Sequence, residues 1–399
     1  MGVLLNKLPK FTEKQKNYFD IISKYSFYLG LFVELTIVIL EKSEYIIQYE
    51  GLWFRFTFLL FGISLMTTKH HLKEWSALFF FGLIGAISYK VTGRNEILRW
   101  IVFIWACQGK EMKKVLKFTF WYTLIGCIVI FLLSVMGIYG AVFQEAVYRT
   151  QYAWTPGVLE RRFTFGMGHP NAFHCMMLVV TWLGIYCYFN KIKWYGYLFI
   201  SLGHIIIFSF TDSKTGMLMS VITIMVVVIA LRMKKNRYFY MGIIAVVIGA
   251  VGLSVFMAGY SQQVINNGIW HKIDTILSNR ILNLYYDTRT HEGTLASWSL
   301  WSSAEKNVYF DLGIVRMFYW YGVIPSVTYF LCQCRLLWCG YKKNDNRMAI
   351  IIGCITIYSI FEAHFVSDYM GRNYILFFFG MYLKDLLGIE EEKRGIVQR

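Results

Sequence analysis

About twelve apolar runs, separated by mostly short polar connections, constrain the fold of this chain more than any other feature. A helix that crosses a bilayer needs about 20 predominantly apolar residues, and most of these runs approach that length. The sequence therefore predicts an all-α, polytopic integral membrane protein with about 12 transmembrane helices, which form a single transmembrane domain over residues 1–399. The runs lie near residues 20–40, 52–67, 75–92, 97–109, 117–140, 171–190, 194–211, 214–231, 238–258, 316–338, 348–367 and 372–388.

The composition agrees with a membrane protein and disfavours a nucleic-acid partner. The chain is 57% hydrophobic and 16% charged, whereas about a quarter of the residues in a soluble domain are charged. A net charge of +16 could indicate nucleic-acid binding, but the basic residues form short clusters between the apolar runs. Cytoplasmic loops of membrane proteins carry such clusters. We therefore predict that the lipid bilayer, and no nucleic acid, surrounds this chain.

The basic clusters occupy every second connection, which predicts the topology. Lysines fill the N-terminal tail, and further basic clusters alternate with less basic connections along the chain. With an even number of helices, this pattern places both termini in the cytoplasm. The two long loops, residues 141–170 and 259–315, then fall on the outer side. Long loops inside a compact fold are usually functional, so we expect the site to face outward.

The first of four candidate segments precedes the apolar run at 171–190. Arg161 and Arg162 are followed by a glycine-containing stretch and then by His169, Pro170 and Asn171. Proline suits the first position of a helix, and His169 or Asn171 can satisfy its free N–H groups. A helix start beside two arginines is typical of phosphate binding. The alternative is a capping loop whose arginines meet lipid headgroups.

The second candidate segment is the short turn at residues 210–216, between two apolar runs. Asp212 or Ser213 would cap the following helix, and Lys214 adds a cation at the same surface. Taken alone, capping is the better explanation of this turn.

The third candidate segment is the large loop at 259–315 together with the helix that follows it. The loop contains Arg280, and it ends at Asp311, five residues before Arg316. Its many aromatic residues suit either sugar faces or the membrane interface. Carboxylates and cations this close to a bilayer need partners or water, so Asp311 and Arg316 are candidates for an outward-facing site.

The fourth candidate segment joins the last two apolar runs. Glu362 and His364 lie at the outer end of one run, and Arg372 opens the next. A carboxylate at this depth is costly unless it is paired. Function is one explanation, and a structural ion pair between Glu362 and Arg372 is the other.

The sequence predicts no cofactor and no metal site. It contains no phosphate-binding Walker loop, no dinucleotide fingerprint, no zinc-protease HExxH and no nucleophile elbow. The eight cysteines lie in or next to apolar runs rather than in the two long loops. A disulfide framework is therefore not expected.

In order and spacing, these motifs resemble bacterial Wzy-type polysaccharide polymerases, which belong to the superfamily of O-antigen polymerases and ligases. The match looks closest to capsule and exopolysaccharide polymerases. Lys214 stands where arginine is common, and the large loop lacks the His-x-x-Asn pattern of the ligase branch. The similarity covers about residues 140–380 and rests on residues 161–171, 211–216, 279–281 and 311–322, with Glu362 and Asn373 as a late polar pair.

The resemblance implies a GT-C-like membrane glycosyltransferase at the outer face of the bacterial cytoplasmic membrane. The donor would be a growing glycan on undecaprenyl diphosphate, and the acceptor a hydroxyl of a single lipid-linked repeat unit. A chain-length regulator and a flippase are the implied protein partners. Cations would stabilise the leaving diphosphate.

The resemblance also implies roles for individual residues. The base for the acceptor hydroxyl would be Asp311, His169 or Glu362, in that order. The residues expected to bind the diphosphate or the substrate are Arg161, Arg162, Asn171, Lys214, Arg280, Arg316 and Arg372.

Two other functions fit parts of the sequence. A flippase for lipid-linked oligosaccharides would suit the number of spans, but it should line a central cavity with ionisable residues deep in its helices. Here such residues gather near helix ends and in loops. A ligase that transfers the glycan to a different acceptor shares the donor chemistry, and the sequence separates it poorly from a polymerase.

Overall fold

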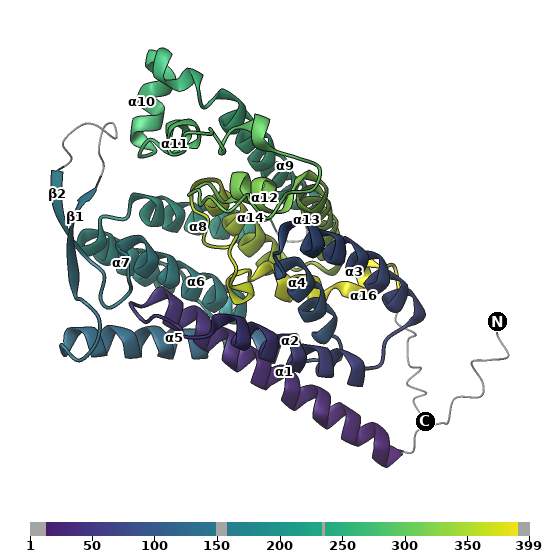
Figure 1. The fold of residues 1–399 in the computed structure, drawn as a ribbon. Coiled ribbons are helices and arrows are strands. Elements are labelled where there is room, and N and C mark those ends of the chain that lie inside the picture. The colour runs from purple at the N-terminus through teal and green to yellow at the C-terminus, as the bar shows by residue number, and fades with distance from the viewer. Residues whose placement is uncertain (1–12, 149–157, 234–235, 390–399) are drawn as a thin grey trace.

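Helices dominate the computed structural model, which describes residues 13–148, 158–233 and 236–389. Within these ranges the chain forms sixteen α-helices and one two-stranded antiparallel sheet (Figure 1). The predicted cytoplasmic placement of the two termini concerns tails that lie largely outside the described residues. Residues 149–157 of the predicted outer loop at 141–170 also lie outside them.

Seven of the described helices are long and apolar enough to cross a membrane. Large apolar side chains such as Phe79 and Phe199 are 75% and 70% exposed on them, as expected where lipid replaces water. These helices indicate a multi-pass membrane protein, and the predicted helical class is confirmed. They are α1 (Glu13–Lys42), α3 (Leu72–Thr92), α5 (Met112–Val135), α6 (Pro170–Tyr188), α7 (Trp194–Thr211), α8 (Lys214–Arg232) and α9 (Arg237–Tyr260).

The helices in the other predicted spans are shorter, more polar or broken. The apolar run at 316–338 divides at Gly322, and the run at 372–388 divides at Tyr382. The helices in these regions are α2 (Glu50–Thr67), α4 (Glu96–Ala106), α12 (Gly313–Tyr321), α13 (Val323–Lys343), α14 (Asn346–Phe361), α15 (Ile375–Met381) and α16 (Leu383–Leu386).

Gly322 ends α12 in a conformation that side chains rarely adopt, with φ at +93°. An added Cβ would lie 2.7 Å from the carbonyl oxygen of Leu300 and 2.8 Å from the amide nitrogen of Ser302. We expect Gly322→Ala to destabilise the fold by about 1–3 kcal/mol from backbone strain alone. Thermal unfolding of the detergent-solubilised protein measures this. Gly242→Ala, in open space on α9, is the control and should leave the melting temperature unchanged or raise it.

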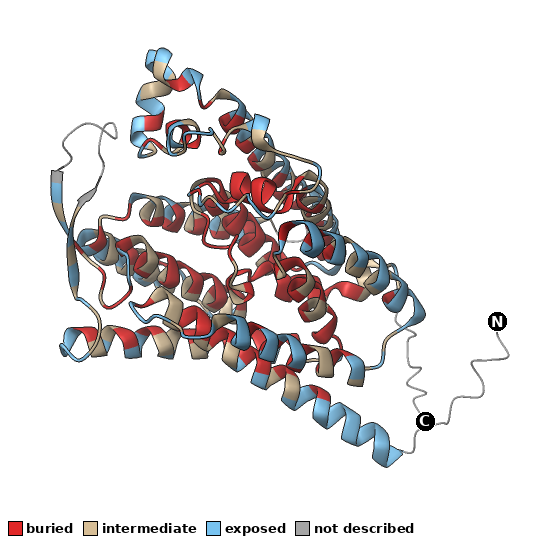
Figure 2. Ribbon diagram, in the orientation of Figure 1, coloured by how far each residue is buried: buried red, intermediate tan, exposed pale blue. Residues whose placement is uncertain are grey.

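The core is centred on α14, which packs against α6, α8, α9, α12 and α13. Almost every residue of α14 is buried, and so is every residue of α12 (Figure 2). A helix that is apolar on all sides has to be surrounded by other helices. The end of α14 is therefore held rigidly, and it carries Glu362.

The two predicted outer loops form short elements of secondary structure between the long helices. The sheet pairs β1 (Phe143–Tyr148) with β2 (Val158–Phe163), and the large loop contains α10 (Gly268–Ile276) and α11 (Arg280–Tyr286). Short 3-10 helices add η2 (Gln263–Asn266), η3 (Leu295–Ser297) and η4 (Met370–Arg372). The sheet lies at the opposite end of the helices from the start of α1 and from α16 (Figure 1).

Candidate functional site

A polar cavity of about 290 Å³ lies where five distant segments of the chain meet. The segments are the end of α1, the start of α6, the start of α11, the stretch before α12 and the stretch after α14. Five of the residues predicted to act as the base or to bind the substrate line it, namely His169, Asn171, Arg280, Asp311 and Glu362.

Arg280 connects three of these segments through one guanidinium group. Its Nη2 donates to Glu362 Oε1 at 2.6 Å, its Nε to Asp311 Oδ2 at 3.2 Å, and its Nη1 to Thr215 Oγ1 at 3.2 Å. The buried carboxylate of Asp274 positions the helix that carries Arg280, because it accepts from the first free backbone N–H groups of α11. The planar fork of arginine suits such multiple contacts, and lysine could not replace it.

Burial and the neighbouring charges shift the pKa values of Arg280 and Glu362. Burial disfavours the Arg280 cation, but the carboxylates of Glu362 and Asp311 outweigh burial and raise the pKa of Arg280. Burial also raises the pKa of Glu362, which Arg280 opposes and Asp311 reinforces. Asn171 Nδ2 donates to the same Oε1 of Glu362 at 3.4 Å. Glu362 is thus held from two sides, whereas the side chain of Asp311 is 53% exposed.

His169 caps α6 and lines the cavity at the same time. Its Nδ1 accepts from the backbone N–H of Asn171 at 3.1 Å, and Pro170 follows as the first helical residue. Desolvation by the surrounding protein, and then the charge of Arg162, lower the pKa of His169 to about 4. The ring is therefore neutral at pH 7, and because Nδ1 accepts, its proton lies on Nε2. The geometry makes His169 a neutral helix cap in the wall of the cavity.

The capping contact and the lowered pKa predict how His169 responds to substitution and to pH. A His with a lowered pKa gains its proton only near pH 4, so raising the pH from 5.5 to 8 should not change its charge. His169→Asn keeps a capping oxygen and one donor. We expect this variant to retain activity within about tenfold, with an unchanged pH profile in that range, whereas loss of a general base costs about 10²–10⁴-fold. Rates measured against pH would separate the two roles.

Arg161 and Arg162 occupy opposite faces of β2, because side chains alternate along a strand. Arg162 is buried, and it donates from Nε to the carbonyl of Thr211 at 2.7 Å and from Nη2 to the carbonyl of Asp212 at 3.0 Å. Its Nη2 also lies 3.3 Å from Asn171 Oδ1, so it fixes the start of α6 against the α7–α8 turn. Arg161 is exposed, stacks over the Phe143 ring at 3.4 Å, and does not line the cavity.

The remaining predicted cations lie around the cavity rather than in its walls. Lys214 is the exposed first residue of α8, next to the Thr215 that contacts Arg280. Arg316 is fully buried on α12, where it donates to the carbonyl of Ala363 and lies over the Tyr309 ring at 3.9 Å. Ala363 and Tyr309 both line the cavity.

The possible ion pair between Glu362 and Arg372 does not form. Arg372 pairs with Glu41, and Glu362 pairs with Arg280. Buried charges take the partner that the packing brings closest, and here the large loop supplies that partner rather than the neighbouring turn.

Lys42 is a cavity residue that the sequence analysis missed. It is the last residue of α1 and lines the cavity, and its Nζ lies 3.8 Å from Glu41 Oε2. A lone lysine at the outer end of an apolar run, in an otherwise acidic connection, was the available indication. His364 also lines the cavity, and among the described residues neither of its ring nitrogens has a hydrogen-bond partner. Its burial lowers its pKa, so the ring is neutral.

The cavity combines two cations, Lys42 and Arg280, with two carboxylates, Asp311 and Glu362. A further cation, Arg316, lies behind Ala363, and two of its nitrogens have no hydrogen-bond partner within the described ranges. In the part of the chain that the structure describes, no three His, Cys, Asp or Glu side chains are grouped as metal ligands.

No protein family, curated protein or solved structure matches this chain.

Proposed function

We propose that this protein polymerises undecaprenyl-diphosphate-linked repeat units into a capsular or extracellular polysaccharide at the outer face of a bacterial cytoplasmic membrane. The observation that supports the proposal is the polar cavity around Arg280. Four of the motif segments on which the resemblance rests contribute to it or contact it, through His169, Thr215, Arg280 and Asp311. Glu362, from the late polar pair, completes the group.

The charges of the cavity suit a lipid diphosphate. Lys42 and Arg280 line it, and Arg316 contacts its wall. When the diphosphate leaves, negative charge develops on its oxygens, and fixed cations in a water-poor site stabilise that charge. Lys42 is the last residue of an apolar helix. The phosphates of a membrane lipid lie at the level where such a helix ends.

The reaction requires one bond to form and one to break. The acceptor hydroxyl oxygen attacks the anomeric carbon of the donor sugar, and the bond from that carbon to the diphosphate oxygen breaks with its electrons on the diphosphate. The hydroxyl proton passes to Asp311, whose carboxylate is the more exposed of the two in the cavity. Glu362 positions Arg280 and Asn171. The bilayer, which holds both lipid-linked substrates, supplies much of their alignment.

Purified protein in liposomes, supplied with lipid-linked repeat units from its own source strain, tests the proposal. Polymerisation predicts a ladder of longer lipid-linked chains and release of undecaprenyl diphosphate. A folded enzyme that forms no ladder would count against a polymerase, and transfer of the whole glycan to another acceptor would indicate the ligase reaction. In a deletion strain, lipid-linked units should accumulate on the outer leaflet; accumulation on the inner leaflet would indicate a flippase instead.

The two neighbouring arginines of β2 provide a matched comparison for this assay. Arg162→Gln removes the contacts that fix Asn171 and the α7–α8 turn, so we expect polymer formation to fall by about tenfold or more. Arg161→Gln removes an exposed charge on the opposite face and should change the rate by less than about threefold. The reverse order of effects would place the substrate on the other side of the sheet.

A further inference from the structure

A second polar cavity, of about 640 Å³, lies among the connection between α4 and α5, the second half of α13, and α15–α16. Its only carboxylate among the described lining residues is Asp385, which pairs with Lys343 at 2.7 Å. The cavity therefore has a large excess of positive charge. Five cations line it, namely Lys110, Arg335, Lys342, Lys343 and Lys384.

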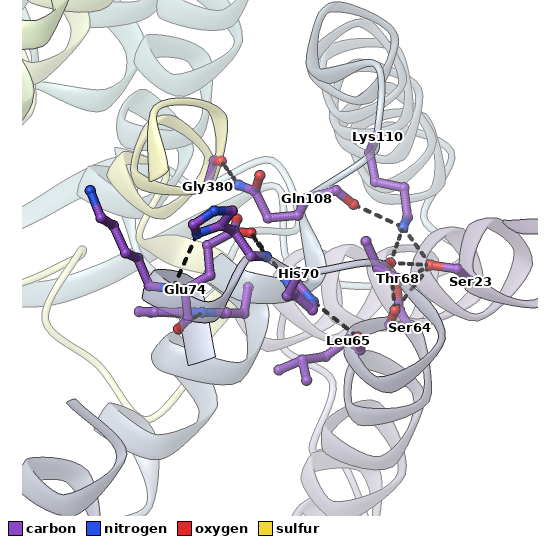
Figure 3. Close-up of polar contacts among 12 residues, drawn as sticks. Ser23, Ser64, Leu65, Thr68, His70, Glu74, Gln108, Lys110 and Gly380 are labelled. Carbon is purple, nitrogen blue, oxygen red and sulfur yellow. Dashed lines mark hydrogen bonds and ion pairs between the residues drawn. The ribbon is translucent and has the colours of Figure 1, made fainter. Parts of the chain in front are cut away.

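This basic cavity lies at the other end of the helices from the candidate active site. Lys110, in its wall, donates to Ser23 of α1 at 2.6 Å (Figure 3). Lys42, in the wall of the outer cavity, lies 19 residues further along the same helix. At 1.5 Å per residue this separation is about 28 Å, close to the roughly 30 Å hydrocarbon thickness of a bilayer. The basic cavity thus lies at the surface that the charge pattern assigns to the cytoplasm.

Fixed contacts shape one wall of this cavity. Gln108 Nε2 donates to the carbonyl of Gly380 at 2.7 Å, and Lys110 Nζ also reaches Thr68 and the carbonyl of Gln108 (Figure 3). Gly380 allows a close approach, because an added Cβ would lie 2.4 Å from that of Cys107. The connection between α4 and α5 is thereby tied to α1, to the end of α2 and to α15.

An apolar groove adjoins the basic cavity. The groove, of about 180 Å³, is lined by side chains from α3, α4, α13, α15 and α16, among them Trp100, Ile104 and Cys332. Arg335 lines both spaces, so this residue marks the point where the apolar groove meets the basic cavity. The clustering of basic residues in cytoplasmic connections explains why cations lie at this surface. It does not explain why they surround a cavity that is joined to an apolar groove.

We infer that an anionic phospholipid of the inner leaflet binds here, with its phosphate in the basic cavity and an acyl chain in the apolar groove. Basic pockets between transmembrane helices on the cytoplasmic side suit anionic headgroups. The groove distinguishes a lipid from a soluble phosphate, which would leave the apolar side chains without a partner. This binding site is separate from the proposed polymerase reaction, and it would tie α4, α13 and α15 together from the inner leaflet.

Native mass spectrometry tests the site on full-length, delipidated protein incubated with equal amounts of phosphatidylglycerol and phosphatidylcholine. We expect selective retention of phosphatidylglycerol. Replacing both Arg335 and Lys384 with glutamine should weaken that binding by about 25-fold, at about 1 kcal/mol for each cation. The control pair is Lys191→Gln with Arg232→Gln, which removes the same charge from the same predicted surface outside the cavity and should retain the lipid.

A second arm separates a lipid from a soluble anion and does not depend on the double variant. Cys332→Trp fills the apolar groove and leaves all five cations in place, so it should also lower phosphatidylglycerol retention. Glycerol phosphate should fail to displace the lipid. Equal retention of the two lipids, an unaffected Cys332→Trp variant, or displacement by glycerol phosphate would each overturn the inference. Unchanged melting temperatures show that each variant is folded.

Discussion

Replacing Arg280 with alanine is expected to abolish polymer formation. The guanidinium group is the only described side chain that contacts Asp311, Thr215 and Glu362 together. Its loss removes a cation from the cavity and leaves the Glu362 carboxylate, whose side chain is only 14% exposed, without its ion-pair partner. Removing one group that stabilises transition-state charge costs about 10²–10³-fold, and the displaced carboxylates add to that loss. Incorporation of labelled repeat units into polymer measures the effect.

Two further variants serve as comparisons for Arg280→Ala. Arg280→Lys keeps the charge but cannot make three directed contacts, so its rate should fall between those of the wild type and the alanine variant. Arg289→Ala removes an exposed arginine from the same large loop, outside the cavity, and should be active. If Arg280→Ala is folded in the membrane and still forms normal polymer, Arg280 does not stabilise the leaving group.

The helices and much of the site could be predicted from the sequence, because both depend on local patterns. Runs of apolar residues determine membrane helices almost regardless of the rest of the chain. The ends of those runs determine where polar residues emerge, so His169, Asn171 and Glu362 could be expected near one surface. Helix ends at the same surface are then within reach of the large loop that carries Arg280.

The details that could not be predicted depend on contacts between distant segments. A strand, rather than an irregular loop, carries Arg161 and Arg162, and its alternation sends the two side chains to opposite faces. The partner of Glu362 proved to be Arg280 from the large loop, although Arg372 is much closer in sequence. Hydropathy also gives no sign of a break inside an apolar run, where Gly322 takes a positive φ against the backbone of residues 300–302.

The second large effect is expected for Asp311→Asn, which preserves the size of the side chain and removes its ability to accept a proton. Arg280 holds Asp311 by a single 3.2 Å contact at Nε, while half of the side chain remains exposed. Glu362, by contrast, is engaged by both Arg280 and Asn171. If Asp311 takes the proton of the acceptor hydroxyl, the asparagine variant should lose about 10²–10⁴-fold in rate.

Asp368 offers a closely matched control for this substitution. Its carboxylate also pairs with an arginine, Arg94 at 3.0 Å, and its side chain is 48% exposed, but it does not line the cavity. Asp368→Asn should therefore leave the rate within about threefold of the wild type. Because a base acts on the acceptor, Asp311→Asn should still bind the lipid-linked donor in a photocrosslinking assay while failing to extend it. Loss of donor binding would make Asp311 a positioning residue for Arg280, and normal extension would remove it from the mechanism.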